Sequence, residues 1–336
     1  MLNNKIILIT GGTGSFGKHL TERILKKHKP KKIIIFSRDE LKQYEMEKKF
    51  HGFENFDCLR FFIGDVRDLP RLNRAMQEVD IVFHAAALKH VPAAEYNPFE
   101  AVKTNIIGAQ NIIDACINSP VKKVIALSTD KAAAPGNLYG ATKLVSDKLF
   151  IAANNFVGNV DKKFSVVRYG NVLGSRGSVV PFFLSLQNNE TYPITDKHMT
   201  RFNISLDEGV NFVLDCLKKM WGGEIFVPRI PSYRILDVVK AINKNAKIKY
   251  VGIRPGEKIH EEMITKTDGL RTIMFKNYYV ILPSFQTRWK IDDFIKDSGS
   301  QPGVYVTDDF SYNSGENEKF LTVNELKLLI KNLQNG

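Results

Sequence analysis

Short apolar runs alternate with segments of helical period along the first half of the chain. The runs are rich in Ile, Val and Phe, and several are apolar on both faces, which predicts buried parallel strands at 5–10, 32–37, 59–63, 80–86, 123–128 and 163–169. Apolar positions at helical spacing predict helices between them at 16–28, 39–50, 69–77, 98–118 and 139–155. This alternation predicts an α/β fold with a doubly wound parallel sheet.

The alternation ends near Gly170. Beyond it the pattern predicts a loop at 171–177, helices at 181–188, 206–220, 235–243 and 323–333, and strands at 224–228, 247–252 and 278–282. The segment 254–264 begins with Arg-Pro-Gly-Glu and is expected to continue as a short helix. We therefore expect a sheet domain over residues 1–170, to which parts of the later chain return, and a smaller mixed α/β lobe over residues 171–336.

The net charge and composition of the chain limit the kinds of ligand and macromolecule that it is expected to bind. Among 336 residues, 48 Lys and Arg against 36 Asp and Glu give a net charge of +12, and 43% are hydrophobic, which excludes a disordered chain. The basic residues are scattered, and no DNA-reading helix, zinc-ligand set or basic face is evident, so no nucleic-acid partner is expected. An acidic small ligand would use only a few of these charges.

The three cysteines, Cys58, Cys116 and Cys216, lie far apart in apolar stretches. Their spacing fits neither a disulfide framework nor a metal site, so we expect a reducing compartment and no metal. No apolar run approaches the length of about 18 residues that a membrane span needs, and the apolar start of the chain resembles a strand rather than a signal peptide. The expected location is the cytoplasm, without a membrane partner.

A glycine pattern, Gly11-x-x-Gly14-x-x-Gly17, joins the first predicted strand to the first predicted helix. Gly11 permits a tight turn, Gly14 lets backbone approach a pyrophosphate, and Gly17 lets helix and strand pack closely. A phosphate then lies at the helix N-terminus, where free N–H groups favour an anion. This setting predicts a Rossmann-type dinucleotide site, for which we select Gly11, Thr13, Gly14, Ser15, Phe16 and Gly17.

The end of the second predicted strand indicates which dinucleotide is bound. An acidic residue here would bind the ribose hydroxyl of NAD, but the strand ends in Ser37-Arg38, and Asp39 comes one residue too late. A hydroxyl and a guanidinium suit the 2′-phosphate of NADP, and Lys42 is placed to assist, so Ser37, Arg38, Asp39 and Lys42 are assigned to this site. The alternative is a helix-capping Ser37 beside a surface arginine.

Further candidates follow the next three predicted strands. Asp65 and Val66 come where such folds commonly contact adenine, and Ala85 and Ala86 are small enough for a cofactor to lie against backbone. Lys89 follows the fourth strand, at the edge where ligands bind. His84 and His90, which flank this edge, are interpreted as structural because nothing nearby has metal-ligand spacing.

The most specific pattern is Ser128-Thr129-Asp130-Lys131 followed by Tyr139-x-x-x-Lys143. The four polar residues follow the fifth strand, and the tyrosine and lysine share one face of the next helix. The Lys143 ammonium is expected to lower the pKa of Tyr139, so that the phenol exchanges a proton with a substrate hydroxyl. Lys143 also suits the cofactor ribose, and Ser128 is assigned to the cofactor.

Together these motifs resemble the extended short-chain dehydrogenase/reductases that act on nucleotide sugars, and among them the inverting UDP-N-acetylglucosamine 4,6-dehydratases of pseudaminic-acid biosynthesis. The resemblance extends from residue 4 to about 265 and thins beyond. It rests on TGGTGSFGK (10–18), FSRDELKQ (36–43), FFIGDVRDL (61–69), HAAALKHVPAAEYNP (84–98), ALSTDKAA (126–133), LYGATK (138–143), SVVRYGNVLGSRGSVVPFF (165–183), MTRF (199–202), LDEG (206–209), GGEIFVP (222–228) and IRPGEKIHE (253–261).

The resemblance implies an NADP-dependent lyase that forms UDP-2-acetamido-2,6-dideoxy-β-L-arabino-hexos-4-ulose. Tyr139, with Thr129 and Lys143, would serve oxidation at C4. Asp130 would protonate the C6 oxygen, and Lys131 would be the base at C5, which requires a pKa lowered by burial or by a neighbouring cation. The residues implied to bind the UDP-sugar are Lys89, Asn171, Val179, Thr200 and Arg254, with Arg201 a weaker candidate.

Other readings of the same motifs stay open. A UDP-hexose 4-epimerase or a C5-retaining 4,6-dehydratase would use the same Tyr139 and Lys143. A non-catalytic NADP-binding regulator of this fold is the alternative from another class. Packing of the helices at 98–118 and 139–155 between subunits, as in related enzymes, is the basis for expecting a homo-oligomer.

Overall fold

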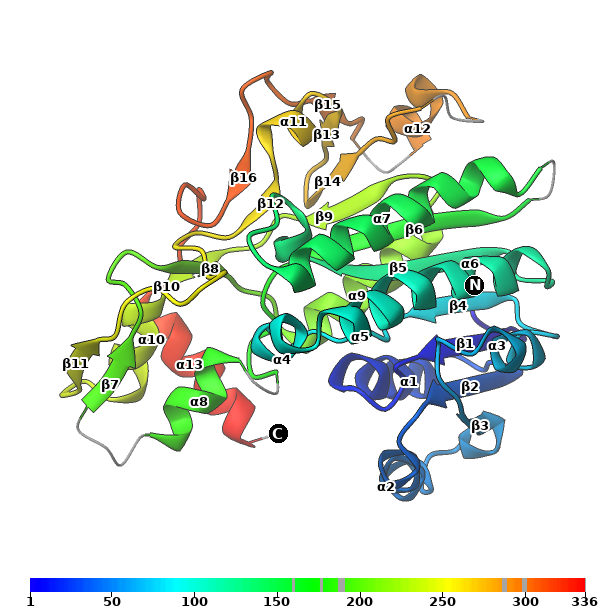
Figure 1. Ribbon diagram of the computed structural model, residues 1–336, viewed down its shortest axis with the longest axis horizontal. Coiled ribbons are helices and arrows are strands. Elements are labelled where there is room, and N and C mark those ends of the chain that lie inside the picture. The colour runs from blue at the N-terminus through cyan, green and yellow to red at the C-terminus, as the bar shows by residue number, and fades with distance from the viewer. Residues whose placement is uncertain (159–160, 176–177, 187–190, 286–288, 298–300, 336) are drawn as a thin grey trace.

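A computed structural model describes residues 1–158, 161–175, 178–186, 191–285, 289–297 and 301–335. Its centre is a ten-stranded sheet in the order β15-β13-β14-β9-β6-β5-β4-β1-β2-β3 (Figure 1). The seven strands in the order β9-β6-β5-β4-β1-β2-β3 are parallel to one another, which confirms the Rossmann-type doubly wound sheet. They are β1 (Ile6–Thr10), β2 (Lys32–Ser37), β3 (Leu59–Ile63), β4 (Ile81–His84), β5 (Lys123–Thr129), β6 (Lys163–Tyr169) and β9 (Ile225–Pro228).

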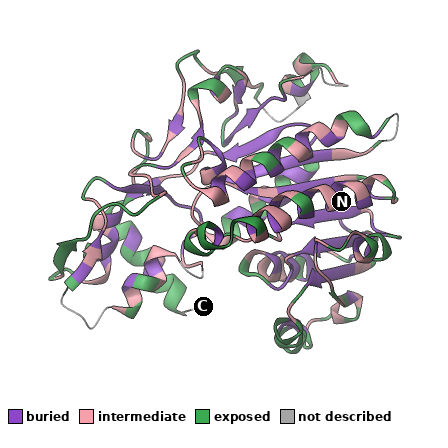
Figure 2. Ribbon diagram, viewed as in Figure 1, coloured by how far each residue is buried: buried purple, intermediate pink, exposed green. Residues whose placement is uncertain are grey.

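Helices cover both faces of this sheet, and the central strands are buried (Figure 2). On one face Leu72, Ile112 and Phe150 from three helices share a core with strand residues such as Leu8 and Val166. These helices are α3 (Leu69–Ala75), α6 (Gly108–Ile117) and α7 (Leu138–Phe156). The other face is covered by α1 (Ser15–Lys27), α2 (Glu40–Phe50), α9 (Leu206–Lys219) and α12 (Ile291–Asp297).

The later chain returns to the sheet, as expected. β9 extends the parallel part, and three antiparallel strands complete that edge: β13 (Thr272–Met274), β14 (Tyr278–Ile281) and β15 (Val304–Tyr305). Within the described residues, no helix is both long enough and apolar enough to cross a membrane. The division of function at residue 170 stays a prediction.

A smaller mixed lobe lies at one end of the sheet (Figure 1). Its own core joins Phe183, Tyr192, Val238 and Leu326. The lobe contains α8 (Val179–Ser185), α10 (Ile235–Ile242) and α13 (Val323–Asn335), with the paired strands β7 (Thr191–Ile194) and β11 (Lys247–Tyr250), and β8 (Thr200–Phe202) and β10 (Ser232–Arg234). The strands β12 (Glu262–Ile264) and β16 (Tyr312–Asn313) pair beside it, and α11 (Lys266–Gly269) follows.

One helix prediction is wrong and another is confirmed with an added feature. The helix expected at 98–118 is continuous in the structure and consists of α5 (Pro98–Val102), the π-helical turn η2 (Lys103–Ile107) and α6, while a separate helix α4 (Val91–Tyr96), which was not predicted, precedes it. Asn97 separates α4 from α5 with φ −122° and ψ 66°, since the proline after it disfavours helical backbone. The helix expected within 254–264 is a loop that leads into β12, because Gly256 adopts φ +75°.

The remaining predicted elements agree in type with the structure and differ at their ends. The helix expected at 181–188 begins at Val179, and its last two residues lie outside the described part of the chain. The described part of the chain also contains the short 3-10 turns η1 (Phe56–Cys58) and η3 (Asp130–Ala132). The second of them directly follows β5 and carries two of the predicted catalytic residues.

Candidate active site

The glycine loop has the close contacts that its sequence predicts. Gly11 adopts φ +63°, and a Cβ on it would lie 2.8 Å from the backbone nitrogen of Ala86. A Cβ on Gly17 would collide with the backbone of Gly12. Gly14 is the N-cap of α1, so the first free N–H groups of that helix, from Ser15 on, face the loop. The loop is therefore a cradle of backbone that would bind a pyrophosphate through its N–H groups.

The end of β2 carries the residues expected to select NADP. The Arg38 side chain is 53% exposed, and its Nη1 lies 3.6 Å from Oδ2 of Asp65, which follows the neighbouring strand β3. The Ser37 hydroxyl accepts a hydrogen bond from Gln43 Nε2 at 3.1 Å, whereas Asp39 is the residue that caps α2, accepting from the Lys42 N–H. The capping alternative for Ser37 is therefore wrong. Arg38 is left accessible at the strand end.

The ends of β3 and β4 lie on either side of β1 and β2. Val66 is buried, and its carbonyl accepts a hydrogen bond from Asn111 of α6 at 3.0 Å. Ala85 and Ala86 follow β4 against the glycine loop, and the Ala86 N–H donates to Thr10 Oγ1 at 3.3 Å. Small side chains at both positions leave the backbone accessible from the strand ends.

His84, at the end of β4, has the structural role expected for it. Its Nδ1 lies 2.8 Å from the Thr10 hydroxyl, and the ring is buried. Burial, with a contribution from the charge of Lys143, lowers the pKa of His84 to about 3. The imidazole is therefore neutral and hydrogen-bonded, which leaves Lys143 as the nearby cation.

The turn from β5 into α7 brings the predicted catalytic residues together. Ala134 adopts φ +42° in this turn, a conformation that non-glycine residues rarely take. Asn137 then caps α7 by accepting the N–H of Gly140 at 2.9 Å. A Cβ on Gly140 would collide with the Lys131 carbonyl, so the first turn of α7, which carries Tyr139, lies directly on η3. The chain between Lys131 and Tyr139 therefore forms a tight turn.

Lys131 lies between two carboxylates, only one of which the sequence predicts. Its Nζ is 3.1 Å from Asp130 Oδ1 and 3.0 Å from Oε1 of Glu261, and these carboxylate side chains are 1% and 4% exposed. Arg201 Nε lies 3.7 Å from the same Oε1. Asp130 Oδ2 and Glu261 Oε2 are buried and have no hydrogen-bond partner within the described part of the chain. The group is a compact cluster of two acids and two bases.

The cluster raises the pKa of Lys131, which was expected to be lowered. Burial alone lowers the pKa of this ammonium, but the charges of Asp130 and Glu261 outweigh burial and raise it well above its ordinary value. Burial raises the pKa of Asp130, while Lys131 and Arg201 overcome burial and lower that of Glu261. The prediction of a lowered Lys131 pKa is therefore wrong, because it did not include the second carboxylate. In the resting protein Lys131 is an ammonium ion.

The pKa of Tyr139 also differs from the expected one, and the pKa of its neighbour Lys143 is shifted as well. Burial raises the pKa of Tyr139 to about 12, although the charge of Lys131 and the Thr129 hydroxyl oppose this effect. Burial lowers the pKa of Lys143, and the carboxylate of Asp147 opposes that effect. The expectation of a lowered Tyr139 pKa is wrong for the resting protein, since burial dominates. Tyr139 therefore rests as a neutral phenol.

A buried ion pair supports this region from behind. Asp147, one turn after Lys143 on α7, accepts a hydrogen bond from the Ser128 hydroxyl at 2.7 Å and pairs with Arg168 of β6 at 3.2 Å. Arg168 is 2% exposed, and it also donates to the Met263 carbonyl at 3.0 Å. The pair thus connects β5, β6, α7 and β12. Neither residue could be identified from the sequence, because a charged residue in a strand or helix carries no sign of its burial.

The residues predicted to bind substrate lie around the same end of the sheet, on different segments. Lys89 follows β4 and Val179 begins α8. Asn171 follows β6, and its side-chain oxygen is buried with no partner among the residues described. The preceding residue, Gly170, lies against the cluster, since a Cβ on it would be 3.5 Å from Asp130 Oδ2.

Thr200 and Arg254 have different surroundings. The Thr200 hydroxyl is buried and bonded to His260 Nδ1 at 2.8 Å and to Ser314 Oγ at 2.7 Å, so it is part of the connection between β8 and the segment before β12. Arg254 is exposed at the start of the loop that leads to β12. Its backbone N–H donates to Glu257 Oε2 at 3.3 Å. The structure leaves the Arg254 side chain accessible and gives the Thr200 hydroxyl internal partners.

Glu261 is the main residue of the site that sequence reasoning missed. It is the last residue of the stretch 253–261 and directly precedes β12. The loop before it is held to the turn before α7, since Asn137 Nδ2 donates to the Gly256 carbonyl at 2.9 Å and Lys258 Nζ to the Ala133 carbonyl at 3.2 Å. These contacts bring Glu261 to Lys131. The only sequence signal was its place in a stretch already matched for other reasons.

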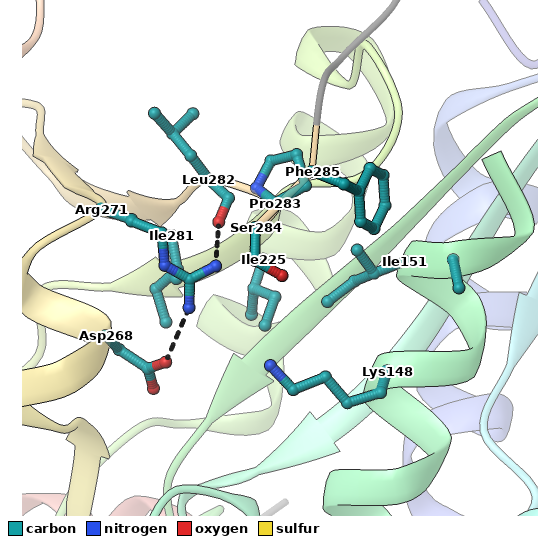
Figure 3. A pocket seen from close by; sticks show the side chains of 11 residues that line it. Lys148, Ile151, Ile225, Asp268, Arg271, Ile281, Leu282, Pro283, Ser284 and Phe285 are labelled. Atoms are coloured by element: carbon teal, nitrogen blue, oxygen red, sulfur yellow. Dashed lines mark hydrogen bonds and ion pairs between the residues drawn. The ribbon is translucent and has the colours of Figure 1, made fainter. Parts of the chain in front are cut away.

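A separate cavity of about 190 Å³ lies behind α7, between this helix and β9 and β14. Figure 3 shows Lys148 and Ile151 of α7 on one side and Arg271, which contacts Asp268 and the Leu282 carbonyl, on the other. None of the residues predicted for catalysis, cofactor or substrate lines this cavity. The candidate active site is therefore the strand-end region, and this cavity is not part of it.

Comparison with known proteins agrees with this geometry. Residues 7–283 match the polysaccharide biosynthesis protein family. A UDP-N-acetylglucosamine 4,6-dehydratase (inverting) from Campylobacter jejuni is 56% identical over 99% of both chains, so the similarity continues past residue 265. A UDP-glucose 4-epimerase from Rickettsia bellii is 39% identical over 99% of this chain and 97% of the relative.

Solved structures give the same answer for the fold. The X-ray structure of Pen from Bacillus thuringiensis covers 99% of both chains with a TM-score of 0.88 and 36% sequence identity. The glycine loop, the Tyr139 and Lys143 pair and the strand order already identify a short-chain dehydrogenase/reductase. The chain therefore belongs to the polysaccharide biosynthesis protein family of extended short-chain dehydrogenase/reductases, the family of the inverting UDP-N-acetylglucosamine 4,6-dehydratases.

Proposed function

We propose that the protein is an NADP-dependent UDP-N-acetylglucosamine 4,6-dehydratase, a lyase that inverts C5 of the sugar and supplies the first intermediate of pseudaminic-acid biosynthesis. The observation that carries the proposal is the buried acid–base cluster of Asp130, Lys131 and Glu261 beside Tyr139. Oxidation at C4 needs only a tyrosine and lysine pair, whereas elimination of water needs an additional acid and base. The 56% identical relative of the same length supports this reading.

The residues at the strand ends fit NADP. The backbone cradle of Gly11 and Gly14 suits the pyrophosphate, and its close packing requires glycine, because a Cβ on Gly11 would collide with the backbone of Ala85 and Ala86. The exposed Arg38 guanidinium suits the 2′-phosphate, and the buried Lys143 ammonium suits the ribose. A nicotinamide dinucleotide held by these residues would supply reversible hydride transfer, first from C4 and then to C6.

Tyr139 and Lys143 act on the C4 hydroxyl. Tyr139 accepts the hydroxyl proton as its phenolate, which forms when the resting phenol releases its own proton to solvent. The Thr129 hydroxyl and the charge of Lys131 favour that phenolate. Lys143 is buried beneath Tyr139 on the same face of α7, where its charge is maintained by Asp147. The C4 ketone formed in this step acidifies the hydrogen at C5.

Asp130 and Lys131 then act on C6 and C5. Burial raises the pKa of Asp130, so its carboxyl takes up a proton more readily than an exposed aspartate, and in its protonated form it donates that proton to the C6 oxygen as water leaves. Lys131 removes the C5 proton as its amine and afterwards carries that proton as an ammonium. Return of a proton to the opposite face of C5 inverts that centre.

The remaining assignments extend the same proposal. Lys89, Asn171, Val179 and Arg254 would bind the UDP-sugar, with Thr200 supporting them through its hydrogen bonds. Residues 1–170 would hold NADP, and residues 171–336 would supply most substrate contacts. A cytoplasmic location and a homo-oligomer formed through α5–α6 and α7 belong to the proposal as well.

A 4-epimerase is the second candidate, because the Rickettsia bellii relative has that name at 39% identity. An epimerase leaves the C5–H and C6–O bonds intact, so it gives the buried carboxylates at Lys131 no proton to transfer. A C5-retaining dehydratase would use the same groups but return the C5 proton to its original face. Product analysis separates the three reactions.

The test is incubation of the protein with UDP-N-acetylglucosamine and catalytic NADP in D₂O, followed by NMR of the product. We expect loss of water, one solvent deuteron at C5 with inverted configuration, and no net absorbance change from reduced cofactor, because the hydride returns. Retained C5 configuration with deuterium would favour the retaining dehydratase. Formation of the C4 epimer without dehydration would favour the epimerase, and accumulation of NADPH would point to a simple dehydrogenase.

A second expected result concerns cofactor choice. Wild-type protein should bind NADP about tenfold or more tightly than NAD, and Arg38→Ala should remove much of that preference, because the guanidinium is the accessible cation at the end of β2. Calorimetric titration with both cofactors measures the ratio. Arg74→Ala, at an exposed arginine in the last turn of α3, is the matched control and should leave it unchanged. Equal wild-type affinities would contradict the NADP assignment.

A further inference from the structure

Lys131 must lose a proton before it can act as the base at C5. A base must be unprotonated, but Lys131 rests as an ammonium between Asp130 and Glu261. With an ordinary lysine pKa of about 10.4, only about one amine in 10³ is neutral at about pH 7, and here the neutral fraction is smaller still. The enzyme therefore needs a local route for removing this proton.

Glu261 is placed to provide that route. Its Oε1 is 3.0 Å from Lys131 Nζ, within hydrogen-bond distance, and the carboxylate side chain is 4% exposed. Its second oxygen is buried and has no hydrogen-bond partner among the described residues, so it is a site where a proton can reside. Asp130 is the less suitable acceptor, because it must itself hold the proton that it gives to the C6 oxygen.

We propose that Glu261 is a positioning residue that fixes Lys131 against Asp130 and accepts the proton that Lys131 must release before it acts as the base at C5. The proposal rests on the proposed function, in which Lys131 removes the C5 proton. In this step one N–H bond of the ammonium breaks and an O–H bond forms on Glu261, with no change of oxidation state. A charged pair becomes a neutral pair, and no solvent base is required.

Burial of the pair by substrate favours this transfer. In the resting protein the transfer is uphill, because Arg201 and Lys131 both favour the Glu261 carboxylate. The Lys131 side chain is 23% exposed, and a sugar bound over it would remove its remaining water. Loss of water disfavours a charged pair relative to the neutral amine and acid, so the cost of the transfer falls when substrate binds.

The groups around Glu261 determine its response to pH. Lys131 and Asp130 face it from η3, Arg201 from β8 and Tyr233 from β10, and Lys258 lies on its own segment. The lowered pKa of Glu261 and the raised pKa of Lys131 keep both charged across the neutral range. Internal transfer between them therefore gives wild-type elimination little dependence on pH from these two groups between about pH 6 and about pH 9.

The test compares Glu261→Gln, Glu261→Asp and the matched control Glu262→Gln, which alters the adjacent glutamate on β12. Single-turnover mixing with NADP and UDP-N-acetylglucosamine follows C4 oxidation by cofactor reduction and elimination by product NMR. We expect Glu261→Gln to slow elimination about 10²- to 10³-fold near pH 7, with C4 oxidation within about threefold of wild type. Its elimination rate should rise about tenfold per pH unit, because Lys131 must now lose its proton to solvent.

The remaining variants separate the role of Glu261 from that of Lys131. Glu261→Asp should keep a flat pH profile at reduced rate, since its carboxylate still accepts a proton, and Glu262→Gln should match wild type. A wild-type rate in Glu261→Gln, or a slowed rate with an unchanged pH profile, would overturn the inference, as would a rising profile in Glu261→Asp. If Lys131→Ala instead eliminates water normally, the proposed function of Lys131 is wrong, and that result is distinct from failure at Glu261 alone.

Discussion

Lys131→Ala should block loss of water while the protein still folds and binds NADP, at a lower stability because the buried Asp130 and Glu261 carboxylates lose this cation. Lys131 is the only base assigned to C5, and removal of a general base typically lowers a rate about 10²- to 10⁴-fold. Tyr139 and Lys143 are left in place, so C4 oxidation should continue and a bound 4-keto sugar should accumulate with reduced cofactor. A single-turnover absorbance trace of the reduced nicotinamide, followed by NMR of the quenched mixture, measures both steps.

The control for this variant is Lys122→Ala, at an exposed lysine just before the opposite end of β5. It should eliminate water at the wild-type rate and incorporate deuterium at C5 as the wild type does. Dehydration at the wild-type rate in Lys131→Ala would contradict the proposed mechanism. A failure of Lys131→Ala to bind NADP would instead show that the residue has a structural role in the strand-end region.

Arg168→Met should destabilise the protein by about 3–5 kcal/mol, because it leaves the Asp147 carboxylate buried without its partner. The side chains of Arg168 and Asp147 are 2% and 1% exposed, so water does not replace the lost contact. The Met263 carbonyl loses its donor as well. Urea unfolding, with the midpoint and slope compared to wild type, measures the loss.

Two further variants identify the origin of this effect. Asp147→Leu in the Arg168→Met background should recover part of the stability, because a buried pair replaced by apolar side chains of similar size is often neutral or better. Lys218→Met removes an exposed ion pair with Asp215 and should change stability by less than about 1 kcal/mol. Equal effects of Arg168→Met and Lys218→Met would contradict the importance assigned to burial.

Local sequence determined the parallel sheet and the first part of the site. Several of the strands β1 to β6 are apolar on both faces, and all six alternate with helical segments, so their type and order could be predicted without tertiary information. The glycine loop could also be predicted, because its residues are adjacent in sequence and their contacts follow from backbone geometry. The same holds for Tyr139 and Lys143, since a spacing of four places both on one helix face.

The local structure of two segments predicted as helices, 98–118 and 254–264, was less predictable. The helix expected at 98–118 contains a π-helical turn, within which Asn105 is buried and bonds to the backbone of Leu88 and to Thr142. The segment 254–264 has polar and apolar residues at helical spacing, but Gly256 with φ +75° turns the chain toward α7. In both segments the contacts with distant residues outweigh local preference.

Tertiary structure decided the electrostatics of the site. Lys131 meets Glu261 only because the loop before β12 is held to the turn before α7, and no local pattern joins these two segments. That contact helps raise the pKa of Lys131, although a lowered pKa was expected. Burial likewise raises the pKa of Tyr139, for which a lowered value was also expected. Sequence thus determined which chemical groups are present at the strand ends. Their charge states depend on burial and on partners from distant segments, and only the fold sets those.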